Sequence, residues 1–318
     1  MNKRIALICG ISGQDGAYLA QFLLNKGYTV FGTSRDAQGS SFGNLKKLGI
    51  KDQVQFIFMA PEDFRSVLVA LRKSNPDEIY YLAGQSSVGL SFEQPAETMQ
   101  SITVGALNML EGCRMMDKNI RLYHAGSGEC FGDTHGASAN ENTPFYPMSP
   151  YAVAKASAYW LVKNYRDAYG LFTCTGILFN HESPLRPERF VTQKIIHAVK
   201  RIADGGNEKL RLGRLDISRD WGWAPEYVEA MWLMLQQDKA EDYVVATGAP
   251  VALEDFVRAA FESAGLNWKD HVIQDEKLFR PADASISFGD PSKAFEKLGW
   301  KAGIQGVEVA KKMYQSIH

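Results

Sequence analysis

Four side chains in the middle of the chain have the types needed for acid and base chemistry on a hydroxyl-bearing substrate. Tyr151 and Lys155 are four residues apart, so on a helix they share one face, and a nearby ammonium can lower the pKa of a phenol from about 10. Ser127 can hydrogen-bond the same hydroxyl, and Glu129 can act on an adjacent carbon. We predict these four as the catalytic residues.

The same helical stretch contains a second pair with this spacing, Tyr159 and Lys163. Only one pair can carry the chemistry. Ser127 follows a strand-like run and should lie at the carboxyl edge of a parallel sheet, where folds of this type bind ligands. We therefore assign the catalytic role to Tyr151 and predict that Tyr159 is structural.

A glycine-rich turn follows the first strand-like run and opens a helical pattern. Its glycines permit a tight turn and a close approach of the backbone to a pyrophosphate, and the free amides at the helix start face the anion. The spacing, GxxGxxG, is one residue longer in its first interval than the usual dinucleotide fingerprint. The predicted cofactor-binding residues here are Gly10, Ser12, Gly13, Gln14, Asp15 and Gly16.

The end of the second strand-like run indicates which nicotinamide dinucleotide is bound. An acidic residue there holds the ribose hydroxyls of NAD, whereas a cation accommodates the extra phosphate of NADP. Ser34 and Arg35 favour NADP, while Asp36, the next residue, keeps NAD as the less favoured alternative. We predict that Ser34, Arg35, Tyr151 and Lys155 complete the cofactor site.

Strand-like runs alternate with amphipathic helical patterns along the first half of the chain, which predicts an α/β fold with a Rossmann-type, doubly wound parallel sheet. The expected strands are Ile5–Cys9, Thr29–Gly32, Val54–Phe58, Glu78–Leu82, Arg121–Ala125, Thr173–Leu178 and Tyr243–Ala246. The expected helices are Ala17–Asn25, Val67–Lys73, Thr103–Met116, Tyr151–Tyr169 and Thr192–Asp204.

The rhythm changes after Leu178, with prolines and with turn-rich segments around Gly205-Gly206 and Asp216–Trp221. We predict a smaller α/β substrate domain interleaved with the first. The dinucleotide-binding Rossmann domain would comprise 1–176, 216–247 and 283–291, and the substrate domain 177–215, 248–282 and 292–318.

Bulk composition excludes several classes of function. A net charge of −1 over 318 residues gives no electrostatic footprint for nucleic acid, and no apolar run is long enough for a membrane span. We expect neither partner and no metal. The four cysteines form no CxxC pair, which predicts buried thiols and a cytoplasmic location.

Longer motifs extend these patterns over nearly the whole chain. They are Gly10–Leu19, Asn142–Pro147, Ser149–Lys155, Ile177–Pro184, Arg219–Gly222 and Phe279–Ala282. On these residues the chain resembles the GDP-mannose 4,6-dehydratase family, within the extended short-chain dehydrogenase/reductase group. The resemblance implies an internal redox cycle on a GDP-hexose. Tyr151 would take the proton of the 4-hydroxyl as hydride passes from C4 to NADP, and Glu129 would remove the C5 proton. Water would then leave C6, which takes back the hydride.

The resemblance also implies a binding site for the nucleotide sugar. Asn180, Lys194, Arg219 and Arg280 would line the GDP site, since cations and amide donors suit a diphosphate and a guanine. A pocket lined by Ser86, Ser87 and neighbouring loops would hold the sugar. His124 and His181 are expected to pack or to hydrogen-bond without a catalytic role.

Several positions depart from the family pattern. Ser127 and Gly128 replace a usual Thr and a usual Ser or Asp, and Asp283 replaces a usual Glu. Met59-Ala60-Pro61 lacks a common adenine contact, which would fall to Glu62 or Asp63 or be absent. The adjacent arginines that join many members into tetramers are here Arg35–Gln38. We therefore expect a homodimer, with a tetramer as the alternative.

Three other functions compete with dehydration of GDP-mannose. The first is dehydration of a related GDP-hexose or GDP-heptose, and the second is reduction or epimerisation of a GDP-4-keto-sugar. The third, a non-catalytic NADP-binding protein, is disfavoured because all four predicted catalytic residues are present.

Overall fold

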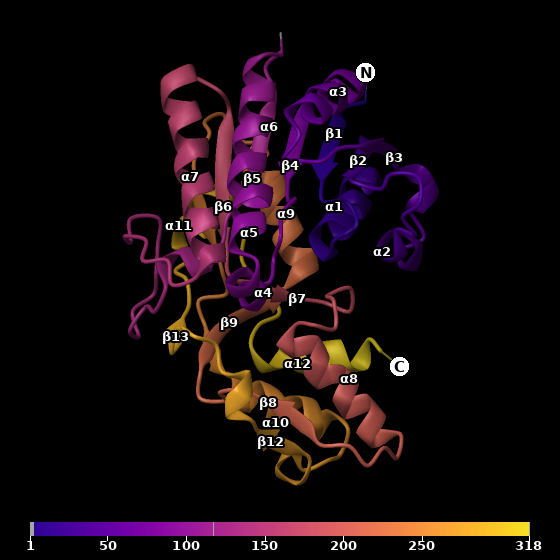
Figure 1. The fold of residues 1–318 in the computed structure, drawn as a ribbon, viewed down its shortest axis with the longest axis vertical. Coiled ribbons are helices and arrows are strands. Elements are labelled where there is room, and N and C mark those ends of the chain that lie inside the picture. Colours follow the sequence, from indigo (N-terminus) through magenta and orange to yellow (C-terminus); the bar gives the residue numbers. More distant parts are fainter. Residues whose placement is uncertain (1–2, 117, 318) are drawn as a thin grey trace.

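The computed structural model describes residues 3–116 and 118–317 (Figure 1). Within them, the largest element is a parallel sheet with strand order β10-β6-β5-β4-β1-β2-β3. Its strands are β1 (Ile5–Cys9), β2 (Thr29–Ser34), β3 (Gln55–Phe58), β4 (Glu78–Tyr81), β5 (Arg121–Ala125), β6 (Thr173–Leu178) and β10 (Tyr243–Val245). Every residue of β4 and β6 is buried, as expected for parallel strands covered on both faces. The predicted Rossmann-type sheet is confirmed.

Helices cover both faces of this sheet and bury separate apolar clusters against it. One face carries α1 (Gln14–Asn25), α2 (Gly43–Lys47), α9 (Ala224–Leu235) and α11 (Ser292–Leu298). The other carries α3 (Phe64–Ser74), α6 (Gly105–Arg114) and α7 (Pro150–Tyr169). The short helices α4 (Val88–Glu93) and α5 (Pro95–Met99) and a π-helical turn (Gln100–Val104) lead into α6, which therefore begins later than predicted.

Helix α7 begins and ends on strong local signals. The Ser149 hydroxyl accepts a hydrogen bond from the Ala152 amide at 3.1 Å, and Pro150 occupies the first helical position. Gly170 closes the helix in the left-handed region, with φ of 68°. This start fixes Tyr151 in the first turn and Lys155 one turn later.

A second region lies below the sheet in Figure 1. Strands β7 (Asn180–Glu182), β9 (Ser218–Trp223), β11 (Pro250–Ala252) and β13 (Ile286–Ser287) form one sheet, and β8 (Leu210–Leu212) pairs with β12 (Val272–Gln274). The helices of this region are α8 (Val191–Ala203), α10 (Leu253–Ser263) and α12 (Val307–Gln315), which share an apolar core. Short 3₁₀ turns lie at Lys51–Gln53, Gly128–Phe131, Trp268–Asp270 and Glu276–Leu278.

One element of this region corrects the sequence analysis. The segment Asp216–Trp221 was expected to be turn-rich, but Ser218–Trp223 is a strand whose last five residues are all buried. It forms because β7, β11 and β13 all pair with it, and these partners are distant in the sequence. Strand β9 thus joins the second sheet, although 216–247 was assigned to the Rossmann domain. The domain boundaries stay a prediction.

The loop after the Gly128–Phe131 turn is held by a segment near the end of the chain. The amides of Thr134 and Ala139 donate to the carbonyls of Ile286 and Phe288, both at 3.0 Å. The Asp290 amide donates back to the Ala139 carbonyl at 2.8 Å. Residues 134–139 and 286–290 therefore form one wall beside the carboxyl end of the sheet.

Candidate active site

Ser127 and Glu129 lie directly beyond the carboxyl end of β5. The chain passes close to β6 there, since a Cβ on Gly126 would meet Thr175 Cγ2 at 2.6 Å and the Gly176 carbonyl oxygen at 3.0 Å. Ser127 is buried, and its hydroxyl accepts a hydrogen bond from the Glu129 amide at 3.3 Å. Glu129 is half-buried. The tight turn therefore holds a hydroxyl and a carboxylate at one edge of the sheet.

Helix α7 brings Tyr151 and Lys155 to the same place. Both side chains are buried, and Tyr151 hydrogen-bonds with Ser127. The Lys155 ammonium donates to the Ala125 carbonyl at 2.8 Å and lies 5.9 Å from the centre of the Tyr151 ring. The structure thus gathers all four predicted catalytic side chains around the end of β5.

The electrostatics of Tyr151 differ from the sequence expectation. Burial raises the pKa of the phenol; the Ser127 hydrogen bond opposes this and the Glu129 charge adds to it. Burial lowers the pKa of Lys155 to about 8. The prediction that the ammonium makes Tyr151 a stronger acid is therefore wrong for this state of the protein, because spacing reveals the neighbouring charge but not the cost of desolvation.

The glycine turn fits a diphosphate. Gly10 has φ of +92°, and a Cβ on Gly16 would come within 2.8 Å of the Ile11 Cα, so α1 packs directly against the turn. A Cβ on Gly13 would meet only the Gly10 carbonyl oxygen, at 3.3 Å. The first amides of α1 have no partner within the helix and are available to an anion. This backbone can hold the pyrophosphate of a dinucleotide.

Two residues predicted to bind the cofactor use their side chains elsewhere. The Gln14 amide donates to the His181 carbonyl at 3.1 Å and accepts from the Ser183 hydroxyl at 2.8 Å. Asp15 accepts from His181 Nε2 at 3.0 Å. Ser12 is exposed at the turn. Gln14 and Asp15 can meet a cofactor through their amides, while their side chains tie α1 to β7.

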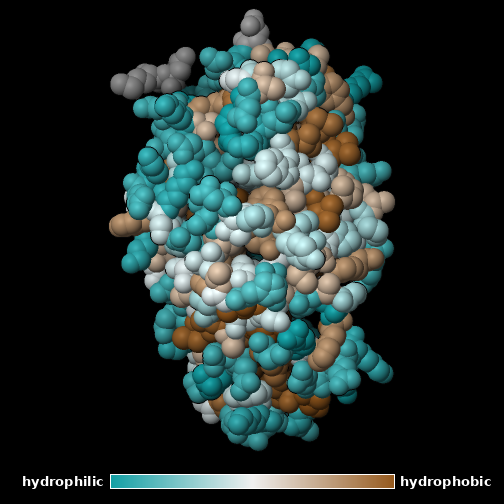
Figure 2. Space-filling model, turned by 90° about the vertical axis from the view of Figure 1, so that its left-hand side faces the viewer, coloured by the Kyte–Doolittle hydropathy of each residue, from teal (hydrophilic) through white to brown (hydrophobic). Residues whose placement is uncertain are grey.

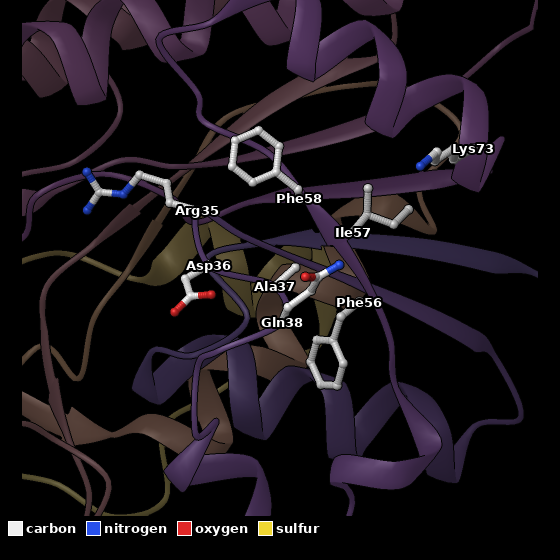
Figure 3. A pocket seen from close by; sticks show the side chains of 8 residues that line it. All are labelled: Arg35, Asp36, Ala37, Gln38, Phe56, Ile57, Phe58 and Lys73. Carbon is white, nitrogen blue, oxygen red and sulfur yellow. The ribbon is translucent and has the colours of Figure 1, made fainter.

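At the end of β2, Asp36 is engaged by its own loop. Its carboxylate accepts from the Gly39 amide at 2.7 Å, and its amide donates to the Ser34 hydroxyl at 3.1 Å. Arg35, next to Ser34, lines a pocket of about 440 Å³. Figure 3 shows the Arg35 side chain pointing away from Gln38. The other lining residues are Asp36, Ala37, Gln38, Phe56, Ile57, Phe58 and Lys73.

The similarity to known proteins extends over nearly the whole chain. A family model described as GDP-mannose 4,6 dehydratase matches residues 7–313. The chain belongs to the GDP-mannose 4,6-dehydratase family. It is 46% identical to GDP-mannose 4,6 dehydratase 2 of Arabidopsis thaliana over 98% of this chain and 86% of the relative. It is 42% identical to GDP-mannose 4,6-dehydratase of Vibrio cholerae over 98% and 93%. The predicted family is confirmed.

The fold has close structural relatives outside this family. A crystal structure of UDP-glucose 4-epimerase from Thermus thermophilus, in complex with NAD, superimposes with a TM-score of 0.86 at 26% identity. The match covers 98% of this chain and 97% of that one. A nicotinamide dinucleotide therefore suits this fold.

Two of the side chains predicted to line the GDP site share one carboxylate. Arg219 Nη2 donates to Asp283 at 2.6 Å, and Arg280 Nη1 lies 3.5 Å from the same oxygen. Lys194, on α8, donates to the Arg211 carbonyl of β8 at 2.6 Å. Asn180 begins β7, opposite Trp221. These residues all lie in the second region of the molecule.

The serines predicted to line the sugar pocket lie at the start of α4. Ser87 caps this helix, because its hydroxyl accepts from the Leu90 amide at 3.3 Å, and Ser86 is exposed. Among the described residues, no hydrogen bond joins either serine side chain to the four catalytic side chains. Their substrate role stays a prediction.

The two histidines are hydrogen-bonded, as expected. Burial holds the pKa of His124 well below its usual value, and its Nδ1 lies 3.4 Å from the Thr175 hydroxyl. His181 is bonded through both ring nitrogens. Arg186 was not among the predicted site residues; its positive charge opposes the rise in the pKa of Tyr151 and helps to lower the pKa of Asp15. Its signal was its place two residues after the Ile177–Pro184 motif.

Two family departures have local structural correlates. A Cβ on Gly128 would lie 2.8 Å from the Phe179 ring, so the ring occupies the space of the usual side chain. Asp63 caps α3 by accepting from the Arg65 amide at 3.0 Å, which engages one of the two proposed adenine contacts.

In the part of the chain that the structure describes, no helix has the length and apolarity to cross a membrane, and no cluster of side chains could hold a metal.

Proposed function

We propose that this protein converts GDP-mannose to GDP-4-keto-6-deoxymannose with NADP, using Ser127, Glu129, Tyr151 and Lys155. One observation supports this most strongly. A hydroxyl, a carboxylate, a phenol and an ammonium meet at the carboxyl end of β5, next to a glycine turn that fits a pyrophosphate. Removal of water needs both a group for the 4-hydroxyl proton and a base for the C5 proton, and this site has both.

When bound, the nicotinamide supplies reversible hydride exchange with the sugar. The residues of the chain bind, donate and accept the protons. Ser127 orients the 4-oxygen, and Tyr151 exchanges a proton with it. Because burial favours the protonated phenol, the Ser127 hydrogen bond and the Arg186 charge are the influences that favour the phenolate.

Glu129 gives the site its dehydratase character. A ketone at C4 acidifies the C5 proton, and a half-buried carboxylate beside Ser127 can remove it. The same acid can then protonate the departing 6-hydroxyl. An enzyme without this carboxylate would stop at the ketone.

NADP is favoured over NAD by the loop after β2. An acidic side chain selects NAD only if it faces the ribose, and Asp36 instead accepts from the Gly39 amide. Among the described residues the Arg35 guanidinium forms no ion pair, so it can meet a phosphate. The test is the ratio of activity with the two coenzymes; better use of NAD would overturn the assignment.

We also propose a homodimer formed through the outer faces of α6 and α7. Val153 and Trp160 on α7 and Met115 after α6 are exposed apolar side chains on neighbouring helices. Figure 2 shows apolar patches among polar ones on the side of the molecule that includes α7. Sedimentation velocity should give the mass of a dimer.

A cytoplasmic location accords with four buried, free cysteines.

The decisive experiment measures the product. Purified protein with GDP-mannose and a catalytic amount of NADP should give a product lighter by one water, without net formation of NADPH. Net consumption of NADPH with a GDP-4-keto-sugar would instead identify a reductase, and turnover of another GDP-hexose or a GDP-heptose alone would change the substrate.

Glu129→Gln separates the two halves of the reaction. This variant should still oxidise C4 but lose water about 10²–10⁴ times more slowly, the usual contribution of a positioned acid or base. Single-turnover absorbance at 340 nm would then show reduced coenzyme that persists. Dehydration at the wild-type rate would remove Glu129 from this role.

A further inference from the structure

A largely buried ion pair joins the glycine turn to the strand that carries Asn180. His181 Nε2 donates to Asp15 Oδ2 at 3.0 Å, and the two residues are 166 positions apart. Asp15 lies in the first turn of α1, directly after the glycines that fit a pyrophosphate. His181 lies in β7, next to Asn180. The pair therefore connects the cofactor side of the proposed site with its nucleotide-sugar side.

The geometry requires His181 to carry two protons. Its Nδ1 lies 2.7 Å from the Phe179 carbonyl oxygen, and its Nε2 faces the Asp15 carboxylate. Both partners can only accept hydrogen bonds when Asp15 is ionised, so a ring that satisfies both is an imidazolium. Burial acts to raise the pKa of Asp15, but the charge and hydrogen bond of His181, together with Gln14 and Arg186, lower it to about 2. Burial lowers the pKa of His181, but the Asp15 charge and hydrogen bond raise it overall.

The surroundings hold the imidazolium ring in one orientation. The Tyr227 ring of α9 stacks on it with centroids 4.6 Å apart. Gly222 of β9, the residue paired with His181, makes this stacking possible, because a side chain there would collide with the Tyr227 ring. The other titratable groups that act on the pair are Arg186 after β7, Lys155 of α7 and Tyr123 of β5.

A neutral hydrogen-bond pair runs beside the ion pair. The Ser183 hydroxyl donates to Gln14, whose amide nitrogen donates to the His181 carbonyl and to Asp15 at 2.9 Å. Gln14 and Ser183 are both buried. Two consecutive side chains of α1 thus hold the backbone and the ring of β7 in fixed register.

We propose that Asp15 and His181⁺ are positioning residues that hold β7, and with it the bound sugar nucleotide, in register with the cofactor-binding turn. This inference rests on the proposed function. The pair touches neither reacting carbon; it sets the distance between two ligands bound to different parts of the chain. Misplacement of reactants by about 1 Å can cost about 100-fold in rate, so the pair should act on kcat more than on KM.

Asp15→Asn tests the proposal. This substitution keeps the shape but removes the charge that keeps His181 protonated. We expect kcat at pH 8 to fall at least about tenfold, with KM for GDP-mannose and Kd for NADP changed less than about threefold. Activity should recover in part at pH 6, because the fraction of His181 that carries a second proton rises as the pH falls. His181→Gln should show the same loss of kcat without the recovery at pH 6.

Glu78→Gln is the matched control. Glu78 is a carboxylate at the amino end of β4, even more buried than Asp15, and it pairs with Arg4 at 3.1 Å. It lies at the opposite end of the sheet from the proposed site. Its loss should lower the melting temperature but leave kcat and its pH dependence unchanged. Asp15→Asn with wild-type kcat and pH profile would overturn the proposal. So would a kcat loss equal at pH 6 and pH 8, which indicates a structural role alone.

NMR titration of the histidine ring signals tests the Asp15–His181 ion pair without measuring turnover. The ring signals of His181, assigned with His181→Gln, should titrate above 6.5 in the wild-type protein and lower in Asp15→Asn. If wild-type protein left GDP-mannose unchanged, the proposed function would fail, while this titration would still decide on the ion pair. A His181 that titrates as a free histidine would overturn the pair.

Discussion

Helix α7 carries two Tyr and Lys pairs with the same spacing, and they meet different surroundings. Tyr151 and Lys155 lie beside Ser127 and the Ala125 carbonyl at the end of β5. Tyr159 instead packs edge-on against Phe145, with ring centroids 4.8 Å apart. Eight residues on a helix turn the side chain by about 80°, because each residue adds about 100°. The second pair therefore faces an aromatic cluster rather than the site.

Sequence spacing alone could not separate the two pairs. Strand β5 separates them, because Ser127, at its carboxyl end, lies beside Tyr151 and not beside Tyr159. The pKa of Tyr159 is raised to about 12, by burial and by the negative charge of Asp242, with which it hydrogen-bonds. Both phenols thus hold their protons tightly. Tyr151 differs in that Ser127 and Glu129 lie beside it, and this difference can be tested directly.

The largest expected effect comes from Tyr151→Phe. Removal of the hydroxyl that exchanges the 4-hydroxyl proton should lower kcat by about 10²–10⁴-fold, while the buried ring keeps the fold intact. Steady-state kinetics and a thermal melt measure both. If Tyr159→Phe reduced kcat as much as Tyr151→Phe does, the assignment between the two pairs would be reversed.

An intermediate effect should appear at alkaline pH. Because burial lowers the pKa of Lys155 to about 8, its ammonium is lost as the pH rises past that value, and activity should fall by about tenfold per pH unit. This group does not cause unfolding there. Its pKa is lower folded than unfolded, so between about 8 and 10.5 the unfolded chain binds more protons, and Lys155 makes stability rise with pH.

Lys155→Arg sharpens this test. A guanidinium stays charged throughout the range, so whatever activity the variant retains should decline at higher pH than in the wild type. An unchanged alkaline limb would assign it to another group. A melt at each pH serves as the control for folding.

The smallest effects belong to the second pair. Tyr159→Phe should cost about 1 kcal/mol of stability through the lost hydrogen bond with Asp242, and kcat should stay within about twofold. Lys163→Ala, at a half-buried position further along the helix, should change neither by more than that. Urea denaturation and initial rates are sufficient to measure both.

Local patterns predicted the sheet well. Strands such as Arg121–Ala125 and Thr173–Leu178 were predicted with their observed bounds, because continuous apolar runs between turn signals are typical of covered parallel strands. Strand β9 was missed, since its partners β7, β11 and β13 come from three other segments. Its pairing is a property of the folded chain and leaves no periodic signal in Ser218–Trp223.

The candidate site also has features that local sequence predicted and features that depend on the folded chain. Tyr151, Lys155 and Ser127 could be grouped from spacing and from their place after a strand. The side-chain role of Asp15 could not, because its partner His181 is brought to it only by the sheet. The direction of the Tyr151 pKa was also missed, since it depends on burial.

The wall formed by residues 134–139 and 286–290 has a consequence for how the enzyme is made. The loop that follows Glu129 is pinned by backbone bonds to a segment more than 140 residues later in synthesis. A nascent chain can assemble most of its large sheet before residues 286–290 are made, yet the loop beside the proposed site lacks its bonding partners until then. Stop codons before residue 285 should therefore give proteins with much of their fold and an unfinished site.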